Sequence, residues 1–178
     1  MSKAFTKEDA GADEVVVPRR APLPEGTPNY VTRRGLQDLR DELTGWETER
    51  ARLQGRPSAE DARRLAIVIA RENELKERIG SAQVVEPGPG AADTVRFGTV
   101  VTLRGGEGPV RHYRIVGVDE ANPAQGRLAF NSPLGRALLG RQVGDVVTLR
   151  AVRGNEELEI VAIEVGEGDA LAIEPSRD

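Results

Sequence analysis

Two adjacent carboxylates, Glu60 and Asp61, are the candidates of this chain for metal chemistry. Mg²⁺ accepts carboxylate oxygens and often takes only one or two of them, together with other oxygen ligands. Neighbouring residues on a helix point about 100° apart, which is poor geometry for one shared ion. The other interpretation is that both acids complement the positive end of a helix dipole. A single carboxylate could still act as a ligand inside a larger complex.

Other kinds of active site are restricted by composition. The chain has no cysteine, and His112 is its single histidine, so cysteine-based metal sites and pairs of histidine ligands are excluded. We interpret His112 as a surface or half-buried strand residue. No nucleophile and base can be paired from the residues available, and the glycine-rich run 104–108 lacks the strand–loop–helix context of a phosphate loop. We expect no enzymatic activity and no cofactor of the protein's own.

The carboxylates follow a strong helical pattern. Apolar residues at alternating spacings of three and four form the seam of a coiled coil. Thr32 is a natural N-cap for this helix, and Gly45 inside it costs about 1 kcal/mol relative to alanine. The seam residues are Leu36, Leu39, Leu43, Trp46, Arg50 and Leu53.

A second helix is predicted from Ser58 to about Ala82. Gly55 ends the first helix and Pro57 bars its continuation, while Ser58 and Asp61 resemble a capping box. The second seam has the same spacing, and Ile69 widens its apolar stripe. Its members are Leu65, Val68, Glu72, Leu75, Ile79 and Ala82.

Two helices joined by a short turn must run antiparallel, so residues 29–84 are predicted to form a hairpin with Glu60 and Asp61 near its tip. Each arm has about 22 residues and spans roughly 33 Å. Arg50 and Glu72 are the charged residues within the seams. Antiparallel pairing brings them to similar heights, and we expect them to face each other.

The flanking segments have different compositions. Residues 1–28 mix charges with four prolines and are predicted to be a disordered or extended tail. Residues 85–94 contain Pro-Gly-Pro-Gly, a linker signal that permits a hinge. Residues 166–178 form an acidic tail.

The period changes to that of strands within residues 95–165. The glycine-rich loop 105–109 connects two of the strands as a hairpin. Residues 130–140 indicate a strand end, a turn and one short amphipathic helix closed by glycine. The strand candidates are Val95–Arg104, Val110–Val118, Gly126–Phe130, Asp145–Val152 and Glu157–Val165.

The order and spacing of three segments resemble the C-terminal domain of the bacterial Gre transcription factors, GreA and GreB. These segments are Ile115–Pro123, Phe130–Gly140 and Val143–Val147. Val31–Leu36 resembles the entry motif of the same family, in which a threonine precedes a glycine by three residues. Ile79–Val85 resembles its exit into the linker. The resemblance covers about residues 30–164.

The resemblance implies an α+β fold. An N-terminal antiparallel two-helix coiled-coil hairpin would precede a C-terminal FKBP-like antiparallel β-sheet domain with one short helix. In this family the hairpin enters the secondary channel of bacterial RNA polymerase, and the C-terminal domain holds the rim of that channel. By resemblance, the polymerase-docking residues would be Asn131, Ser132, Pro133, Leu134, Arg136 and Leu139.

Two positions depart from the pattern of the cleavage factors in this family. Those factors carry an aspartate and a glutamate in a tip loop reading roughly Gly-Asp-Leu-Ser-Glu-Asn, which help to hold a second Mg²⁺ in the polymerase active site. Here residues 55–62 read Gly-Arg-Pro-Ser-Ala-Glu-Asp-Ala, and the arms are about two turns, or roughly 11 Å, shorter. The candidates for metal binding, within the polymerase complex alone, are therefore Glu60 and Asp61. Asn131 stands where those factors usually have aspartate, which removes a charge-assisted bond.

The resemblance implies a transcription elongation factor that binds bacterial RNA polymerase and regulates elongation. Promotion of the cleavage of backtracked RNA, with the Mg²⁺ of the polymerase, is the default of the family. The tip residues favour an alternative, a non-cleaving regulator that competes for the secondary channel. A rival class is an FKBP-like prolyl isomerase or chaperone, but such pockets are rich in aromatic residues and residues 95–165 have only three. An unrelated helical-hairpin adaptor is a further interpretation.

Composition agrees with a protein that recognises another protein's surface. The net charge is −4, and residues 29–82 carry 11 basic and 10 acidic groups, so no basic face dominates. Contact with nucleic acid is expected only indirectly, through the elongation complex. The sequence shows no membrane span and no secretory signal. We expect a cytoplasmic protein with no membrane partner and no small-molecule substrate.

Overall fold

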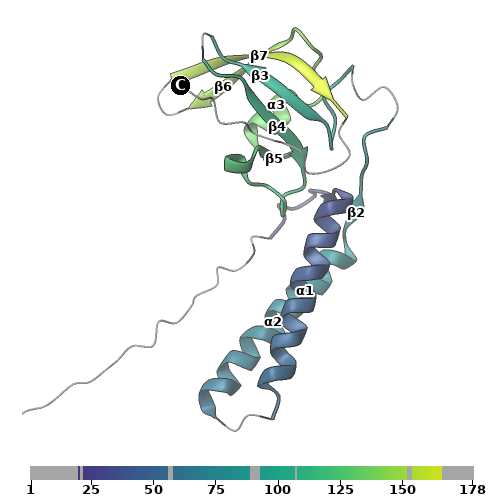
Figure 1. Cartoon of the computed structure of the whole chain (residues 1–178), viewed down its shortest axis with the longest axis vertical. Coiled ribbons are helices and arrows are strands. Elements are labelled where there is room, and N and C mark those ends of the chain that lie inside the picture. Colours follow the sequence, from purple (N-terminus) through teal and green to yellow (C-terminus); the bar gives the residue numbers. More distant parts are fainter. Residues whose placement is uncertain are drawn as a thin grey trace, which may run out of the picture.

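The computed structural model shows a helical hairpin projecting from a small sheet domain (Figure 1). It describes residue 20 and the ranges 22–55, 58–88, 93–106, 108–151 and 154–165. The predicted tails therefore lie largely outside the described residues, as do Arg56 and Pro57 of the turn. No helix in the described part of the chain is both long and apolar enough to cross a membrane.

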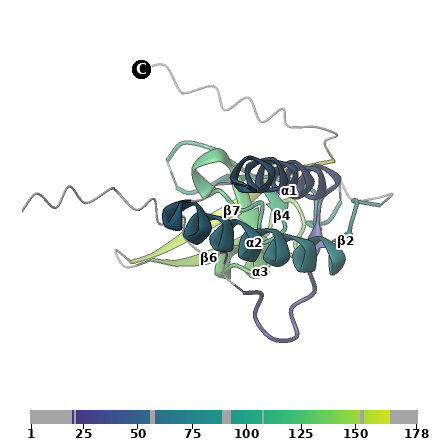
Figure 2. The same cartoon turned by 90° about the horizontal axis from the view of Figure 1, so that it is seen from below.

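The hairpin consists of α1 (Arg33–Leu53) and α2 (Ala59–Gly80), which lie side by side in both views (Figures 1 and 2). The predicted caps are confirmed. The Thr32 side chain accepts a hydrogen bond from the Gly35 N–H, and the Ser58 side chain accepts one from the Asp61 N–H. Gly55 follows α1 with a φ of 85°, so the chain reverses where a left-handed residue is available.

The predicted seam packs between the two helices. Val31, Leu39 and Leu75 are buried, and five partly buried residues pack against them: Leu36, Leu43, Trp46, Ile79 and Ala82. One detail of the prediction is wrong, since Ile69 does not widen the stripe but is 41% exposed. Val68 occupies the seam beside it, and the next residue necessarily turns toward solvent.

Arg50 and Glu72 face each other as predicted, with Arg50 Nη1 lying 3.0 Å from Glu72 Oε2. The two groups are unequally buried, because the Glu72 side chain is 2% exposed and that of Arg50 is 37% exposed. Lys76 Nζ is a second partner at 3.2 Å from the same oxygen, and Glu72 Oε1 has no hydrogen-bond partner. The seam thus contains a buried carboxylate with two cationic partners at one oxygen and no hydrogen-bond partner at the other.

Two very short strands, β1 (Tyr30–Val31) and β2 (Gln83–Val84), close the base of the hairpin. They pair in parallel, with Tyr30 opposite Gln83 and Val31 opposite Val84. The second helix consequently ends at Gly80, slightly before the predicted Ala82.

The sheet domain has the strand order β5-β4-β3-β7-β6. The strands are β3 (Val100–Arg104), β4 (Arg111–Val116), β5 (Arg127–Ala129), β6 (Val146–Ala151) and β7 (Gly154–Glu164). The prediction of an antiparallel sheet is corrected at one pair, since β5 lies parallel to β4. A short 3-10 helix, η1 (Pro123–Gln125), lies in the connection from β4 to β5 and allows this crossover.

The first strand of this domain is shorter than the predicted Val95–Arg104. Gly98 has a φ of 85°, a conformation that interrupts a strand and that favours glycine. Val95 is buried before this break, where its N–H donates to the Arg141 carbonyl and its carbonyl accepts from Gly140. The sequence preceding β3 therefore extends along the loop after α3 (Pro133–Leu138) rather than along the sheet.

The core of the domain lies between α3 and one face of the sheet. Leu134 and Leu138 of α3 belong to the same buried cluster as central strand residues, among them Val101, Leu103 and Ile115. The six-residue helix is too short to be stable alone, so this packing holds it in place and fixes the direction of the chain on either side of it.

The hairpin and the sheet domain meet at a buried carboxylate, that of Glu120, which is 9% exposed. Glu120 Oε1 accepts from the Thr32 N–H at 2.8 Å, and Oε2 accepts from the Thr32 hydroxyl at 2.5 Å. A Cβ on Gly35 would overlap this carboxyl group, and one on Gly117 would overlap the Tyr30 carbonyl oxygen. Both glycines therefore permit a close approach that no other residue allows.

Three aromatic rings pack beside this carboxylate. Tyr30 lies 6.0 Å from Phe97 and 5.5 Å from Phe130, measured between ring centroids, and Phe97 and Phe130 are 5.9 Å apart. Edge-on and tilted contacts of this kind stabilise beyond their buried area. The hairpin is consequently joined to the sheet domain by both polar and apolar contacts.

Replacing Glu72 with leucine is expected to raise the free energy of unfolding by about 1 kcal/mol, because it removes a half-satisfied buried carboxylate from an apolar seam. Arg50→Ala is expected to lower it by about 2 kcal/mol, because Glu72 stays buried with Lys76 as its remaining cation. Urea unfolding followed by far-UV circular dichroism measures both. Glu77→Leu, on the exposed face of α2, is the control. A large loss of stability in Glu72→Leu would contradict this account.

Gly35→Ala is expected to destabilise the protein by about 2 kcal/mol, although alanine favours a helix by about 1 kcal/mol. The added methyl group displaces the Glu120 carboxylate from Thr32. Gly45→Ala is the matched control in the same helix, where a Cβ meets nothing within 4 Å, and it should stabilise. In a Glu120→Ala background the cost of Gly35→Ala should largely disappear. Equal effects at Gly35 and Gly45 would refute the packing argument.

Candidate functional site

The predicted docking segment forms an exposed corner between β5 and α3. The Ser132 N–H donates to the Ala129 carbonyl, and the Ser132 Oγ accepts from the Gly135 N–H, both at 3.0 Å. Pro133 occupies the first helical turn, where a missing N–H costs nothing. The corner is thus held by a helix cap and by a residue with a fixed φ.

Of the six residues predicted for docking, four are exposed or partly exposed at the surface, and two leucines pack in or against the domain core. Pro133 and Arg136 are exposed, and Asn131 and Ser132 are partly exposed. Leu134 is 8% exposed and lies in the domain core, and Leu139 packs against that core. Leu134 therefore supports the corner from inside the domain, and Leu139, which is partly exposed, stays a predicted docking residue. We keep the name corner for Asn131, Ser132, Pro133 and Arg136.

The close fit of α3 against β5 requires a glycine at position 135. A Cβ there would overlap the Ala129 carbonyl oxygen. The same carbonyl accepts the Ser132 N–H. Gly135 therefore supports the corner in two ways. Its N–H donates to Ser132, and its lack of a side chain lets α3 approach β5 closely.

The hairpin tip uses one of its two carboxylates for capping. The Ser58 hydroxyl accepts from the Asp61 N–H at 2.9 Å and donates to Asp61 Oδ2 at 2.6 Å, which a hydroxyl can do at the same time. Glu60 is exposed. Within the described ranges, no three or more His, Asp and Glu side chains lie where they could hold a metal ion. Glu60 and Asp61 are thus brought close in the chain but are not arranged as a metal site.

Two arginines near the tip end of the hairpin pair with an acidic residue of α1. The Glu49 carboxylate forms ion pairs with Arg64 at 2.8 Å and with Arg52 at 3.1 Å. Both arginine side chains are about two-thirds exposed. Both arginines are thus partly neutralised by Glu49.

The other residues considered for chemistry have structural surroundings. His112 is exposed, and its Nδ1 lies 3.0 Å from the Thr102 hydroxyl of the neighbouring strand. Trp46 packs against the hairpin core as predicted. Neither residue lies in a site with converging polar groups.

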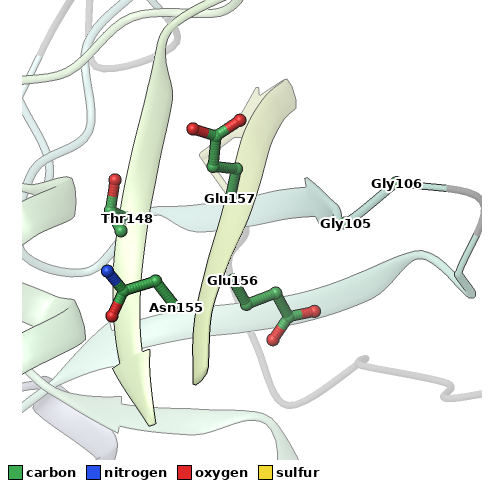
Figure 3. Close-up of a pocket in the computed structure, with 6 residues that line it drawn as sticks. All are labelled: Gly105, Gly106, Thr148, Asn155, Glu156 and Glu157. Carbon is green, nitrogen blue, oxygen red and sulfur yellow. The ribbon is translucent and has the colours of Figure 1, made fainter. Parts of the chain in front are cut away.

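An open hollow of about 730 Å³ lies at the far end of the sheet. It is lined by Gly105, Gly106, Thr148, Asn155, Glu156 and Glu157. Figure 3 shows Glu156 and Glu157 on opposite sides of β7, as expected for consecutive strand residues. Glu156 forms an ion pair with Arg111. The two carboxylates therefore do not converge on one ligand.

Sequence reasoning missed the acidic pair Asp119 and Glu120. Their segment was recognised only as part of a family pattern, and their partners lie far away in the chain. The signal available was two glycines, Gly35 and Gly117, in segments that carry the resemblance, because glycine often marks a close approach between backbones.

Comparison with known proteins identifies the class to which this architecture belongs. A family profile described as transcription elongation factor, GreA/GreB, C-terminal, matches residues 90–165. The GreB transcription elongation factor of Neisseria meningitidis is 34% identical over 154 residues, which are 78% of this chain and 94% of that protein. This chain belongs to the GreA/GreB family of transcription elongation factors.

Further relatives include a GreA protein and a GreA homolog of known structure. GreA of Chloroflexus aggregans is 34% identical over 152 residues, covering 76% of this chain and 97% of its own length. Among solved structures, the GreA factor homolog Gfh1 of Thermus thermophilus covers 78% of this chain and 99% of its own, with 24% identity and a TM-score of 0.38.

Proposed function

We propose that this protein binds bacterial RNA polymerase through the corner of its sheet domain and presents its hairpin to the secondary channel, where it regulates elongation. The observation that carries this proposal is the arrangement of the two parts. The corner is exposed and held rigid by α3, and the hairpin leaves the same domain as a narrow projection (Figure 1). Membership of the GreA/GreB family supports the same partner.

The corner has a chemistry suited to a protein surface. The Asn131 amide both donates and accepts hydrogen bonds, and the exposed Arg136 supplies a positive charge beside it. Pro133 adds a rigid apolar contact. An acidic or carbonyl-rich segment of the polymerase would complement this set, because a guanidinium pairs well with carboxylates.

The tip favours a factor that occupies the channel without promoting strong RNA cleavage. Cleavage through a second Mg²⁺ requires acidic ligands that are free to leave the protein surface. Asp61 is committed to Ser58, which leaves Glu60 as a single exposed carboxylate. The protein would then act on elongation by excluding other channel-binding factors, with no catalytic group of its own.

Prolyl isomerase activity has little support. The three aromatic residues of the sheet domain are all used in packing, since Phe97 and Phe130 contact Tyr30 and Tyr113 packs against the domain core. None is left to line a peptide-binding pocket of the aromatic kind.

Binding of the purified protein to core RNA polymerase tests the proposal directly. We expect a stable complex, and we expect Arg136→Ala to weaken it by about tenfold, because a hydrogen bond to a charged group contributes about 1.5–3 kcal/mol. Arg104→Ala is the matched control, an exposed arginine on β3 that pairs with Glu159, and it should leave affinity unchanged. Failure of a folded sample to bind, where a GreA protein binds under the same conditions, would refute the proposal.

A transcript-cleavage assay on stalled elongation complexes decides between the two modes of action. We expect weak or no stimulation of cleavage and competition with an active GreA protein. Glu60→Ala and Asp61→Ala together should not change the result beyond a loss of hairpin stability of about 1 kcal/mol from the damaged cap. Strong cleavage that is abolished by Glu60→Ala alone would assign a metal-ligand role to Glu60 and overturn the non-cleaving mode.

A further inference from the structure

Arg20 connects three parts of the molecule, although it precedes every segment that carries the family resemblance. Its Nη2 lies 2.5 Å from Glu42 Oε2 on α1, and its Nη1 lies 2.8 Å from Asp119 Oδ1 in the sheet domain. Arg78 Nε of α2 approaches the other oxygen of Asp119 at 3.1 Å. One carboxylate thus receives a guanidinium from α2 and another from the N-terminal segment.

This network is buried at Asp119 and open to solvent at Glu42, whose side chain is 44% exposed. The side chains of Asp119 and Arg78 are 6% and 9% exposed, and that of Arg20 is 24% exposed. Burial alone would lower the pKa of Arg20, but Asp119 and Glu42 outweigh it and the pKa is raised. The ion pairs of Asp119 are therefore screened less than pairs on an open surface, whereas the pair of Arg20 with Glu42 is more exposed to salt.

The segment that carries Arg20 is attached at its other end as well. We call Arg20 and residues 22–29 the strap. The Asn29 side-chain amide donates to the Arg78 carbonyl at 2.7 Å and to the Ser81 hydroxyl at 3.0 Å, and the Asn29 carbonyl accepts from the Gln83 N–H. The strap lies at the junction of hairpin and domain (Figures 1 and 2).

The strap is also stiff for a segment without regular structure. Its sequence contains Pro22, Pro24 and Pro28, each of which fixes its own φ and restricts the residue before it. A turn is closed between them by the Thr27 N–H and the Pro24 carbonyl at 2.9 Å. A proline-rich segment of this kind has less freedom than a flexible linker.

The position of Glu42 gives the strap leverage over the hairpin. The contact between Thr32 and Glu120 lies at the start of α1, and Glu42 is ten residues further along, or about 15 Å along the helix axis. The other contacts between hairpin and domain, made by Tyr30, Thr32 and Arg78, lie at the base of the hairpin. A contact at Glu42 lies farther from that base and opposes tilting with a longer lever arm. Because the arms are roughly 32 Å long, a tilt of about 20° would move the tip by about 11 Å.

We propose that Arg20 is a positioning residue: through the strap it fixes the angle at which the hairpin leaves the sheet domain, and so determines where the tip lies when the corner is bound. The effect on the free protein stands by itself, and the consequence for transcription rests on the proposed function. Relative motion is the usual behaviour of two units joined by a linker, so the strap is a specific device against it.

Distance measurements between two spin labels test the proposal in the full chain. The protein has no cysteine, so single cysteines at Gln54, by the tip, and at Thr148, on the sheet, can be labelled without other changes. Both positions are exposed. Wild type should give one narrow distance distribution. Arg20→Ala should broaden it about twofold or shift it, because the hairpin then moves about the Thr32 contact.

Three further variants separate positioning from a general loss of structure. Arg20→Lys should restore much of the narrow distribution, since an ammonium can still reach one carboxylate. Glu42→Gln, at an exposed helix position where folding is not at risk, should broaden it as Arg20→Ala does. Arg104→Ala is the control, because its ion pair lies within the sheet. Identical distributions for wild type, Arg20→Ala and Glu42→Gln would overturn the proposal.

Polymerase assays then test the consequence. Arg20→Ala should bind core polymerase with unchanged affinity, because the corner is intact, but its effect on elongation at saturation should fall several-fold. A parallel loss of affinity and effect would argue against positioning. If wild type itself does not bind polymerase, the proposed function fails, while the label distances still decide whether Arg20 fixes the hairpin.

Discussion

The structure depends on one buried carboxylate, that of Glu120, at the junction of hairpin and sheet domain. A buried charge is tolerated only when hydrogen bonds replace its water, and Thr32 supplies both its N–H and its hydroxyl. The same hydroxyl accepts from the Gly35 N–H to cap α1. Thr32 therefore caps α1 and joins the hairpin to the sheet domain at the same time. The glycines at 35 and 117 leave the space that this requires.

The features that could be predicted from sequence are those set by local spacing. The two seams, the caps at Thr32 and Ser58, and the pairing of Arg50 with Glu72 all follow from positions within a few residues or from the antiparallel geometry of a short turn. Features that depend on distant partners were missed. The parallel pairing of β4 and β5 and the early break at Gly98 are decided by how the sheet domain closes, which propensity does not encode.

The candidate site shows the same division. The cap of α3 at Ser132 could be predicted, but the burial of Leu134 could not, since it depends on which face of a six-residue helix meets the sheet. The glycine- and proline-rich linker indicated a hinge, and its composition does permit one. Contacts from outside the linker oppose that hinge, through Glu120 with Thr32 and through Asp119 with Arg20 and Arg78. The composition of the linker therefore permits a hinge, but the contacts of Glu120 and Asp119 decide whether the hairpin moves about it.

A fixed junction changes how a short hairpin can act under the proposed function. A flexible probe could search for its target, whereas a rigid one reaches only the point set by its arm length and its angle. Both arms are close to the same length, 21 and 22 residues. The tip offers one aspartate held by Ser58 and one exposed glutamate. Under the proposed function, the position of the hairpin tip then matters more than the metal-binding ability of its residues. A hairpin that fills the channel excludes other factors by its volume and needs no metal ligand to do so. The elements that this chain fixes most firmly, the corner and the junction, are those that determine placement.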